Sequence, residues 1–505
     1  MLRPRVVRWI AFVGVFSFFG STVLFRNAPS VSAQNPPPPV PAFVNYAAPE
    51  DCSATHTPPN CIQPALGSTT AGGHGAGEPS IGVDWSSGKA FIEAGNHTLR
   101  VTFNDALTPA AAMWEDKRSP FARVSLDPIL FTDDGHFGGL NRTFSSQLNL
   151  ATSELSFTDD DGDNWTPTQG SGQPAGVDHQ TVGGGPYASP PPLTTPVSYP
   201  HAIYYCSQDI VTAFCSRSDD GGLTFGPGIP IYTFASINGV DRPVAPGTCG
   251  GLHGHVRVSP DGTVYVPNES CRDAGNVDRP GVAVSTDNGL SWTVTTVPDA
   301  TSISPGSDPS VAAGLNNTIY FGYVNGDGHA KVAVSRDRGL HWSASSDAGT
   351  PFGVQNAEFA EVIGGDDDRA AFAFLGTQTS GDTQSATFPG VWHLYAAFTY
   401  DGGRTWITAD ATPSDPVQRG CIWNQGGSNP CRNLLDFNDI TVDRSGRVLI
   451  GYADGCTGTC VNDSTQNATT GPASAQDALA TIARQVGGRG LFAALDGTPF
   501  GARRK

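Results

Sequence analysis

The stretch Ser285-Thr-Asp-Asn-Gly-Leu-Ser-Trp292 decides the fold, because four other stretches of the chain follow the same pattern. Each begins with Ser or Thr and has Asp two positions later, Gly four later and an aromatic residue seven later. The other four are Thr158–Trp165, Ser218–Phe225, Ser335–Trp342 and Thr399–Trp406. The Asp can accept backbone N–H groups of its own turn, and the Gly supplies the positive φ of a tight turn. The pattern therefore predicts a repeated β-hairpin.

Alternating apolar strands such as Gly281–Ser285 and Lys331–Ser335 precede these turns, so chance surface turns are a poor explanation. The repeated stretch resembles the Asp-box, or bacterial neuraminidase repeat, of the sialidase-like β-propellers, over about residues 77–495. The resemblance implies an all-β propeller with Asp-box hairpins. It is less specific for activity, because the same box occurs in sialidases, in other glycan-cleaving propellers and in non-enzymatic receptors.

The number of blades follows from short apolar stretches that begin with an acidic residue or His. They start at Glu78, Asp127, Asp178, His253, Asp308, Glu358 and Asp436. Each is followed by a second strand, such as Thr318–Tyr323, and repeats of four short strands are typical of propellers. We predict one β-propeller of seven four-stranded blades, with six as the alternative. Degenerate copies of the repeated turn are expected near 102–104 and 483–490, in the first and last blades.

The N-terminus has the features of a secretory signal peptide. Arg3, Arg5 and Arg8 precede an apolar run over 9–25, and Val31-Ser-Ala33 provides small residues for cleavage. An uncleaved membrane anchor is the alternative. The predicted domains are a signal peptide over 1–33, a Pro-rich linker over 34–61 and the propeller over 62–500. We expect a secreted protein, extracellular or periplasmic.

All ten cysteines follow the predicted signal peptide and form close pairs along the chain. In an oxidising compartment such pairs predict local disulfides. A zinc site is the alternative, but the sequence has no Cys-x-x-Cys pair. The expected bonds are Cys52–Cys61, Cys206–Cys215, Cys249–Cys271, Cys421–Cys431 and Cys456–Cys460.

The net charge of −18 argues against nucleic acid or an anionic membrane as a partner. A site for an anionic ligand would need a local cluster of Arg. We expect a glycan or glycoconjugate as the partner and a monomeric protein.

The candidate site lies at the starts of the channel-lining strands, because the resemblance places ligands on the face away from the Asp-boxes. The imidazoles of His179, His253 and His255 depart from the acid-Pro pattern of other blades, and His253 and His255 would face one side of a strand. Acids and imidazoles in a channel could perform general acid–base catalysis or bind a divalent metal. Hydrogen-bonded His in a wet channel is the structural alternative. The candidates are Asp178, His179, His253, His255 and Arg257 in blades three and four, with Glu358, Glu361 and Asp439 in blades six and seven.

Four long stretches are expected to form loops, mostly on that face, because loops of this length are often functional. They are 226–252, 376–390, 407–435 and 453–477. The acidic runs 159–163 and 366–368 are interpreted as solvated turns, with structural calcium as the alternative.

The resemblance to sialidases implies three Arg residues around a substrate carboxylate, a Tyr nucleophile assisted by Glu, and an Asp acid. The Arg-Ile-Pro motif of that family is missing from this sequence, and the candidate arginines are Arg242, Arg257, Arg419 and Arg432. We predict a sialidase-like glycan-active protein, an exo-acting glycoside hydrolase that removes a terminal sugar. The alternative is a non-catalytic propeller that binds a glycan, a peptide or a cell-envelope partner.

Overall fold

The computed structural model describes residues 38–65, 72–122, 127–133, 141–149, 152–168, 178–191, 199–209, 211–237, 240–302, 307–470 and 477–500. The predicted signal peptide lies outside these ranges. Within them, no helix is both long enough and apolar enough to cross a membrane. The chain from Pro39 onward forms one compact unit.

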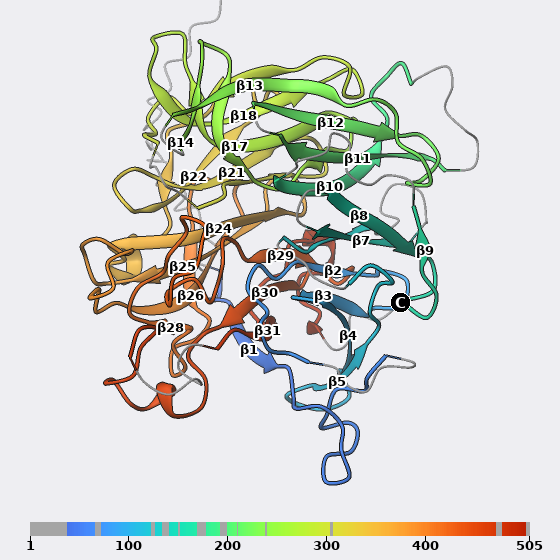
Figure 1. Cartoon of the computed structure of the whole chain (residues 1–505), viewed down its shortest axis with the longest axis vertical. Coiled ribbons are helices and arrows are strands. Elements are labelled where there is room, and N and C mark those ends of the chain that lie inside the picture. The colour runs from blue at the N-terminus through green and yellow to red at the C-terminus, as the bar shows by residue number, and fades with distance from the viewer. Residues whose placement is uncertain are drawn as a thin grey trace, which may run out of the picture. The chain divides into compact units, whose positions relative to one another are not determined.

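Seven antiparallel sheets form the blades of a β-propeller (Figure 1), as predicted. The first three blades take their strands in chain order from the centre outward. Blade 1 contains β2 (Ile81–Val83), β3 (Ala90–Ala94), β4 (His97–Asn104) and β5 (Ala111–Asp116). Blade 2 contains β6 (Ile129–Asp133), β7 (Arg142–Asn149), β8 (Thr152–Thr158) and β9 (Thr166–Pro167). Blade 3 contains β10 (Asp178–Pro186), β11 (His201–Gln208), β12 (Thr212–Ser218), β13 (Ile229–Ile237) and β14 (Val240–Pro243).

The next three blades repeat this order, with small departures in blades 4 and 6. Blade 4 contains β15 (Cys249–His253), β16 (Arg257–Val258), β17 (Val264–Arg272), β18 (Asp278–Ser285) and β19 (Thr293–Thr296). Blade 5 contains β20 (Ser310–Ala313), β21 (Ile319–Val324), β22 (Ala330–Ser335) and β23 (Ser346–Asp347). Blade 6 contains β24 (Asn356–Gly364), β25 (Ala370–Thr377), β26 (Val391–Thr399), β27 (Ile407–Asp410) and β28 (Gln418–Arg419).

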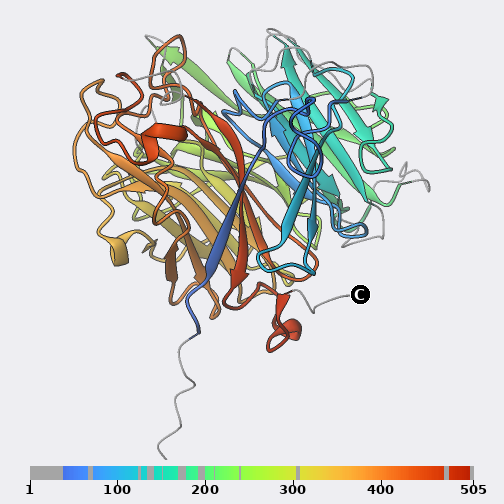
Figure 2. The same cartoon turned by 90° about the horizontal axis from the view of Figure 1, so that it is seen from below.

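Blade 7 is assembled from both ends of the described chain. Its inner strands are β29 (Asp439–Val442), β30 (Val448–Asp454) and β31 (Leu479–Gly487), and β1 (Ala42–Ala47) pairs with β31 as the outermost strand (Figure 2). The predicted linker over 34–61 therefore includes a propeller strand, and the folded domain begins before Cys61. The physical reason is that a blade made of strands from both ends of the chain ties these ends together by backbone hydrogen bonds, which holds the ring closed.

The five repeated turns connect the third and fourth strands of blades 2 to 6 and share one hydrogen-bond pattern. In the copy at Ser285, the Asp287 carboxylate accepts the N–H groups of Leu290 and Ser291 and the hydroxyls of Ser285 and Ser291. The Ser285 hydroxyl in turn accepts the N–H of Gly289, whose φ is +79°. These bonds stabilise the carboxylate form, so the pKa of Asp287 is lowered although partial burial by itself would raise it.

The turn is missing from blade 7 for a topological reason. The fourth strand of that blade is β1, so no hairpin joins it to β31 and the segment 483–490 has no such turn to form. The stretch predicted as a loop over 226–252 also differs, because it contains β13 and β14, which extend the sheet of blade 3.

The blades are held together by aromatic packing between sheets and by disulfides. Tyr320 of blade 5 and Phe372, Phe374 and Tyr395 of blade 6 belong to one buried cluster. All five predicted disulfides are present, and no cysteine is free. Disulfides form and persist in oxidising compartments, so the bonds are consistent with an extracellular protein.

Candidate functional site

The seven inner strands lie side by side around a central channel. Contacts link β2 to β6, β6 to β10, β10 to β16, β16 to β20, β20 to β24, β24 to β29, and β29 back to β2. Because every inner strand runs in the same direction, their first residues gather at one mouth of the channel. This arrangement brings the predicted site residues from different blades close to one another.

At this mouth the backbone takes an unusual conformation in several blades. Glu78, His179, Phe359 and Leu435 have φ between +47° and +59°, which non-Gly residues rarely adopt. The inner strand β24 has a register shift between Glu358 and Glu361. Such a bulge re-aims side chains, and here two buried carboxyl groups three residues apart have different surroundings.

Two of the candidate imidazoles meet at the channel mouth. The His179 Nδ1 lies 3.2 Å from the Asp308 carboxylate of blade 5, and the His179 ring packs edge-on against that of His253. Burial, followed by the neighbouring His179, lowers the pKa of His253 to about 3. His253 is therefore neutral at physiological pH and unsuited to act as a general acid there.

The third imidazole lies in a different group. His255 Nδ1 is 3.8 Å from Asp439 Oδ1 of blade 7, and Arg257 Nη2 is 3.4 Å from the same oxygen. The Glu361 carboxylate also belongs to this group, in which ligand atoms of His255, Glu361 and Asp439 lie within 4.8 Å of one another. We call these four residues the channel cluster.

The prediction that His253 and His255 share one face of a strand is wrong. Strand β15 ends at His253 and β16 begins at Arg257, so the inner strand of blade 4 is interrupted between them. At Gly254 a Cβ atom would lie 1.9 Å from the Pro309 carbonyl oxygen, so glycine allows blade 5 to approach the backbone there. The interruption directs His253 toward His179 and His255 toward Asp439.

The proposed blade-three and blade-four group is thus divided between two locations. His179 and His253 lie together, whereas His255 and Arg257 join Glu361 and Asp439 across the channel. The backbone of Asp178 pairs with Gln208 in the sheet of blade 3, and its side chain lies outside the described residues.

Glu358 occupies a third environment, between blades 5, 6 and 7. Ser307 donates to its carboxylate, as do Thr383 at 3.3 Å and Asn424 at 3.2 Å. Burial raises the pKa of Glu358 to about 7; these hydrogen bonds oppose the rise, and the charge of Asp436 adds to it. A carboxylic acid with this pKa can exchange a proton near neutral pH.

Next to this residue lies an ion pair between Arg432 and Asp436. Arg432 donates two hydrogen bonds, of 2.5 and 2.7 Å, to the Asp436 carboxylate. Glu78 is completely buried nearby, and burial together with the charges of Asp127 and Asp436 raises its pKa well above the usual value. The mouth therefore holds the Asp436 carboxyl, paired with Arg432, beside the Glu78 and Glu358 carboxyls, whose pKa values burial raises.

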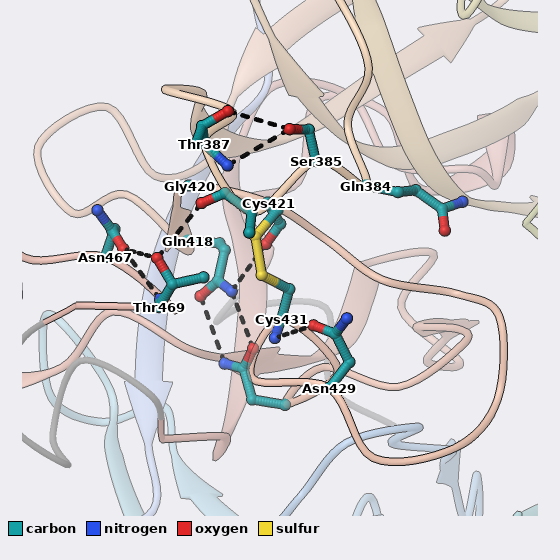
Figure 3. The surroundings of a disulfide bond; sticks show 12 residues. Gln384, Ser385, Thr387, Gln418, Gly420, Cys421, Asn429, Cys431, Asn467 and Thr469 are labelled. Atoms are coloured by element: carbon teal, nitrogen blue, oxygen red, sulfur yellow. Dashed lines mark hydrogen bonds between the residues drawn. A yellow bond between two sulfur atoms is a disulfide. The ribbon is translucent and has the colours of Figure 1, made fainter.

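Loops of blades 6 and 7 cover Glu358. The Cys421–Cys431 disulfide (Figure 3) closes a loop that carries Asn424. Asn424 accepts a hydrogen bond from Gln384 of the preceding loop. Gln425 donates to Gln384 at 2.8 Å. Sequence reasoning named these loops but missed Ser307, Thr383 and Asn424 as partners of Glu358. The cysteines that flank Asn424 are the signal that could have identified it.

Carboxylates of both acidic runs form ion pairs or hydrogen bonds with neighbouring side chains and backbone groups. Asp159 pairs with Arg142, Asp161 with Lys89, and Asp163 with Lys117. Asp367 accepts the Thr318 hydroxyl and N–H. Calcium is not needed to explain these carboxylates.

No protein-family model matches the sequence, and no curated protein matches it. Among solved structures the chain is similar to the Hadza microbial sialidase Hz136, at 14% identity and TM-score 0.40, over 79% of this chain and 73% of that chain. It is similar to the GH93 alpha-L-arabinofuranosidase of Fusarium graminearum, at 12% identity and TM-score 0.31, over 61% and 92%. It is also similar to a variant of Aleuria aurantia lectin, at 11% identity and TM-score 0.38, over 66% and 94%. Likenesses this remote leave the activity to be argued from the chain's own side chains.

Proposed function

We propose that this chain is an exported glycan-active propeller, a glycoside hydrolase that acts at the mouth formed by blades 5, 6 and 7. The observation that supports the proposal is the Glu358 carboxyl, with a pKa of about 7, close to the Asp436 carboxyl that accepts two hydrogen bonds from Arg432. Glycoside hydrolysis uses two carboxyl groups with separated pKa values, one of which protonates the leaving oxygen. In this proposal Glu358 is the acid and Asp436 is the second carboxyl group.

The specific sialidase reaction has less support than glycoside hydrolysis in general. Arg257 contacts Asp439, and Arg432 is bound to Asp436. Arg419 donates to the carbonyl oxygens of Cys460 and Val461. Since these three arginines are already engaged, a terminal neutral sugar is a better candidate substrate than a carboxylated one. The reaction that we propose is exo-acting release of a terminal sugar.

The alternative function is non-catalytic binding of a glycan, a peptide or a cell-envelope partner. It is favoured by the three hydrogen-bond donors that already satisfy Glu358, since a purely structural carboxylate would be held in the same way. The amides of Gln384 and Gln425 above it could bind sugar hydroxyls in either case.

The two functions are separated by a screen of the purified protein against chromogenic glycosides, including a sialoside, with and without chelator. We expect hydrolysis of at least one neutral glycoside, and its rate should fall as pH rises through about 7, because Glu358 must be protonated. Glu358→Gln should lower kcat by about 100-fold or more.

The matched control is Glu93→Gln, which neutralises another buried glutamate, one whose pKa is raised to about 8 by burial. It should keep the activity of the natural protein. No hydrolysis of any glycoside, together with glycan binding that survives in Glu358→Gln, would favour the non-catalytic alternative.

A further inference from the structure

The channel cluster has the composition of a metal site. It offers one imidazole and two carboxylates from three blades: His255 of blade 4, Glu361 of blade 6 and Asp439 of blade 7. Their ligand atoms lie within 4.8 Å of one another, and ligand atoms around a bound ion are about 3 to 4 Å apart. Small side-chain shifts would complete the coordination.

Two atoms of the cluster lack the hydrogen bonds that buried polar atoms normally make. Within the part of the chain that the structure describes, neither His255 Nε2 nor Glu361 Oε2 has a hydrogen-bond partner, and the residues are 5% and 1% exposed. A buried polar atom without a partner costs free energy, so two such atoms in one cluster point to a missing ligand.

The charges in the cluster lead to the same conclusion. Arg257 lies 3.4 Å from Asp439, and a single guanidinium can neutralise only one of the two carboxylates. Asp439 is held in place by the hydroxyl of Ser80 and the N–H of Ile81, both to its Oδ2, while its Oδ1 accepts the N–H of Ile440 and faces His255. A divalent cation would compensate two ionised carboxylates more completely than Arg257 alone.

A cavity lies beside the cluster. It is lined by Arg257 and by residues further along the inner strands, among them Val258, Ile363 and Val442. These residues follow His255, Glu361 and Asp439 in their strands, so the cavity lies on the far side of the cluster from Glu358. Arg257 is the cluster residue that lines it among the described residues.

We propose that His255, Glu361 and Asp439 bind a divalent first-row transition metal ion that ties blades 4, 6 and 7 together across the channel. An imidazole with two carboxylates suits Zn²⁺ or Mn²⁺, whereas Ca²⁺ and Mg²⁺ prefer oxygen ligands alone. The ion is structural, and it is distinct from the hydrolytic function proposed for Glu358.

The test uses the full mature protein, stripped with chelator and then dialysed against micromolar Zn²⁺ or Mn²⁺, with bound metal counted by elemental analysis. We expect a single tightly bound ion per chain and a melting temperature that rises by several degrees when the ion is returned. Glu361→Gln and His255→Gln should each weaken binding by at least about tenfold, because a ligand is lost.

Two control variants sharpen the result. Glu358→Gln lies three residues from Glu361 in the same strand and should bind the ion normally even when glycoside hydrolysis is lost. His341→Gln removes an exposed imidazole paired with Asp337 and tests for binding at the surface. The proposal is overturned if the stripped protein binds no ion tightly, or if Glu361→Gln and His255→Gln bind it as the natural protein does.

Should either variant fail to fold, the absorption spectrum of the Co²⁺-loaded natural protein still decides the question. Ligation by an imidazole and two carboxylates in a low-coordinate site predicts intense visible bands. A weak spectrum typical of hydrated, all-oxygen Co²⁺ would overturn the site.

Discussion

At the scale of single residues, similar carboxylic acids have opposite properties because their surroundings differ. Asp287 lies in a turn where two hydroxyls and two N–H groups donate to it, which lowers its pKa. Glu358 and Glu93 are buried, which raises theirs to about 7 and about 8. The residue type therefore says little about function until its hydrogen bonds and burial are known.

The repeated turns give a residue-scale prediction. Asp287→Ala removes the acceptor for two backbone N–H groups and two hydroxyls, so we expect the free energy of unfolding to fall by about 2 kcal/mol. Chemical denaturation measures the change. Asp368→Ala, at an exposed position, is the control and should cost less than about 0.5 kcal/mol. Equal losses of unfolding free energy for the two substitutions would show that the hydrogen bonds of the turn do not stabilise the protein.

At the scale of elements, the short strand β1 completes blade 7. Its six residues pair with β31 and supply the outer edge of blade 7, so the last blade depends on the first strand. Asn45 also donates to the Ala411 carbonyl of blade 6 at 2.8 Å. A short strand near the N-terminus thereby joins the two ends of the ring.

Truncation tests this dependence. Removal of residues 1–47 should expose the edge of β31 and lower the melting temperature by ten degrees or more, with aggregation, because an unpaired edge strand recruits other chains. Removal of residues 1–37 leaves β1 intact and should keep the melting temperature unchanged. Both are measured by thermal unfolding and light scattering, and equal stability of the two truncations would contradict the closure by β1.

At the scale of the whole molecule, the buried acids predict how stability varies with pH. Burial raises the pKa of Glu93 to about 8 and of Glu358 and Asp454 to about 7. Because the folded state holds these protons more tightly than the unfolded chain, their contribution is present below about pH 4 and lost as pH rises toward 7 to 8. The Asp residues of the repeated turns have the opposite effect on the pH dependence, because their pKa values are lowered and their contribution to stability is lost as pH falls.

The pKa of each of these Asp residues is lowered, that of Asp337 to about 2 by the side chain and N–H of His341. Their stabilisation is present above about pH 4 and lost as pH falls through the lowered values. We therefore expect the highest melting temperature between about pH 4 and 6, measured in thermal scans from pH 3 to 9. Glu93→Gln should flatten the decline above pH 6, and stability that rises steadily from pH 5 to 8 would contradict this account.

The sequence by itself determined the blades, because the features that define them are local. The turn at Ser285–Trp292 carries its own hydrogen bonds within eight residues, and each cysteine pair lies close along the chain, so both could be recognised without a fold. The approximate start of each inner strand followed from the same local patterns.

Only the tertiary structure decided which residues meet. Contacts such as His255 with Asp439, or Asn424 with Glu358, join residues 66 or more positions apart, and no periodicity encodes them. The interruption of the inner strand at Gly254 separated two imidazoles that regular alternation would have placed together, because blade 5 packs directly against that glycine. The use of β1 to complete blade 7 was likewise invisible in the sequence, since closing a ring depends on the positions of its two ends in space and not on the local pattern of either.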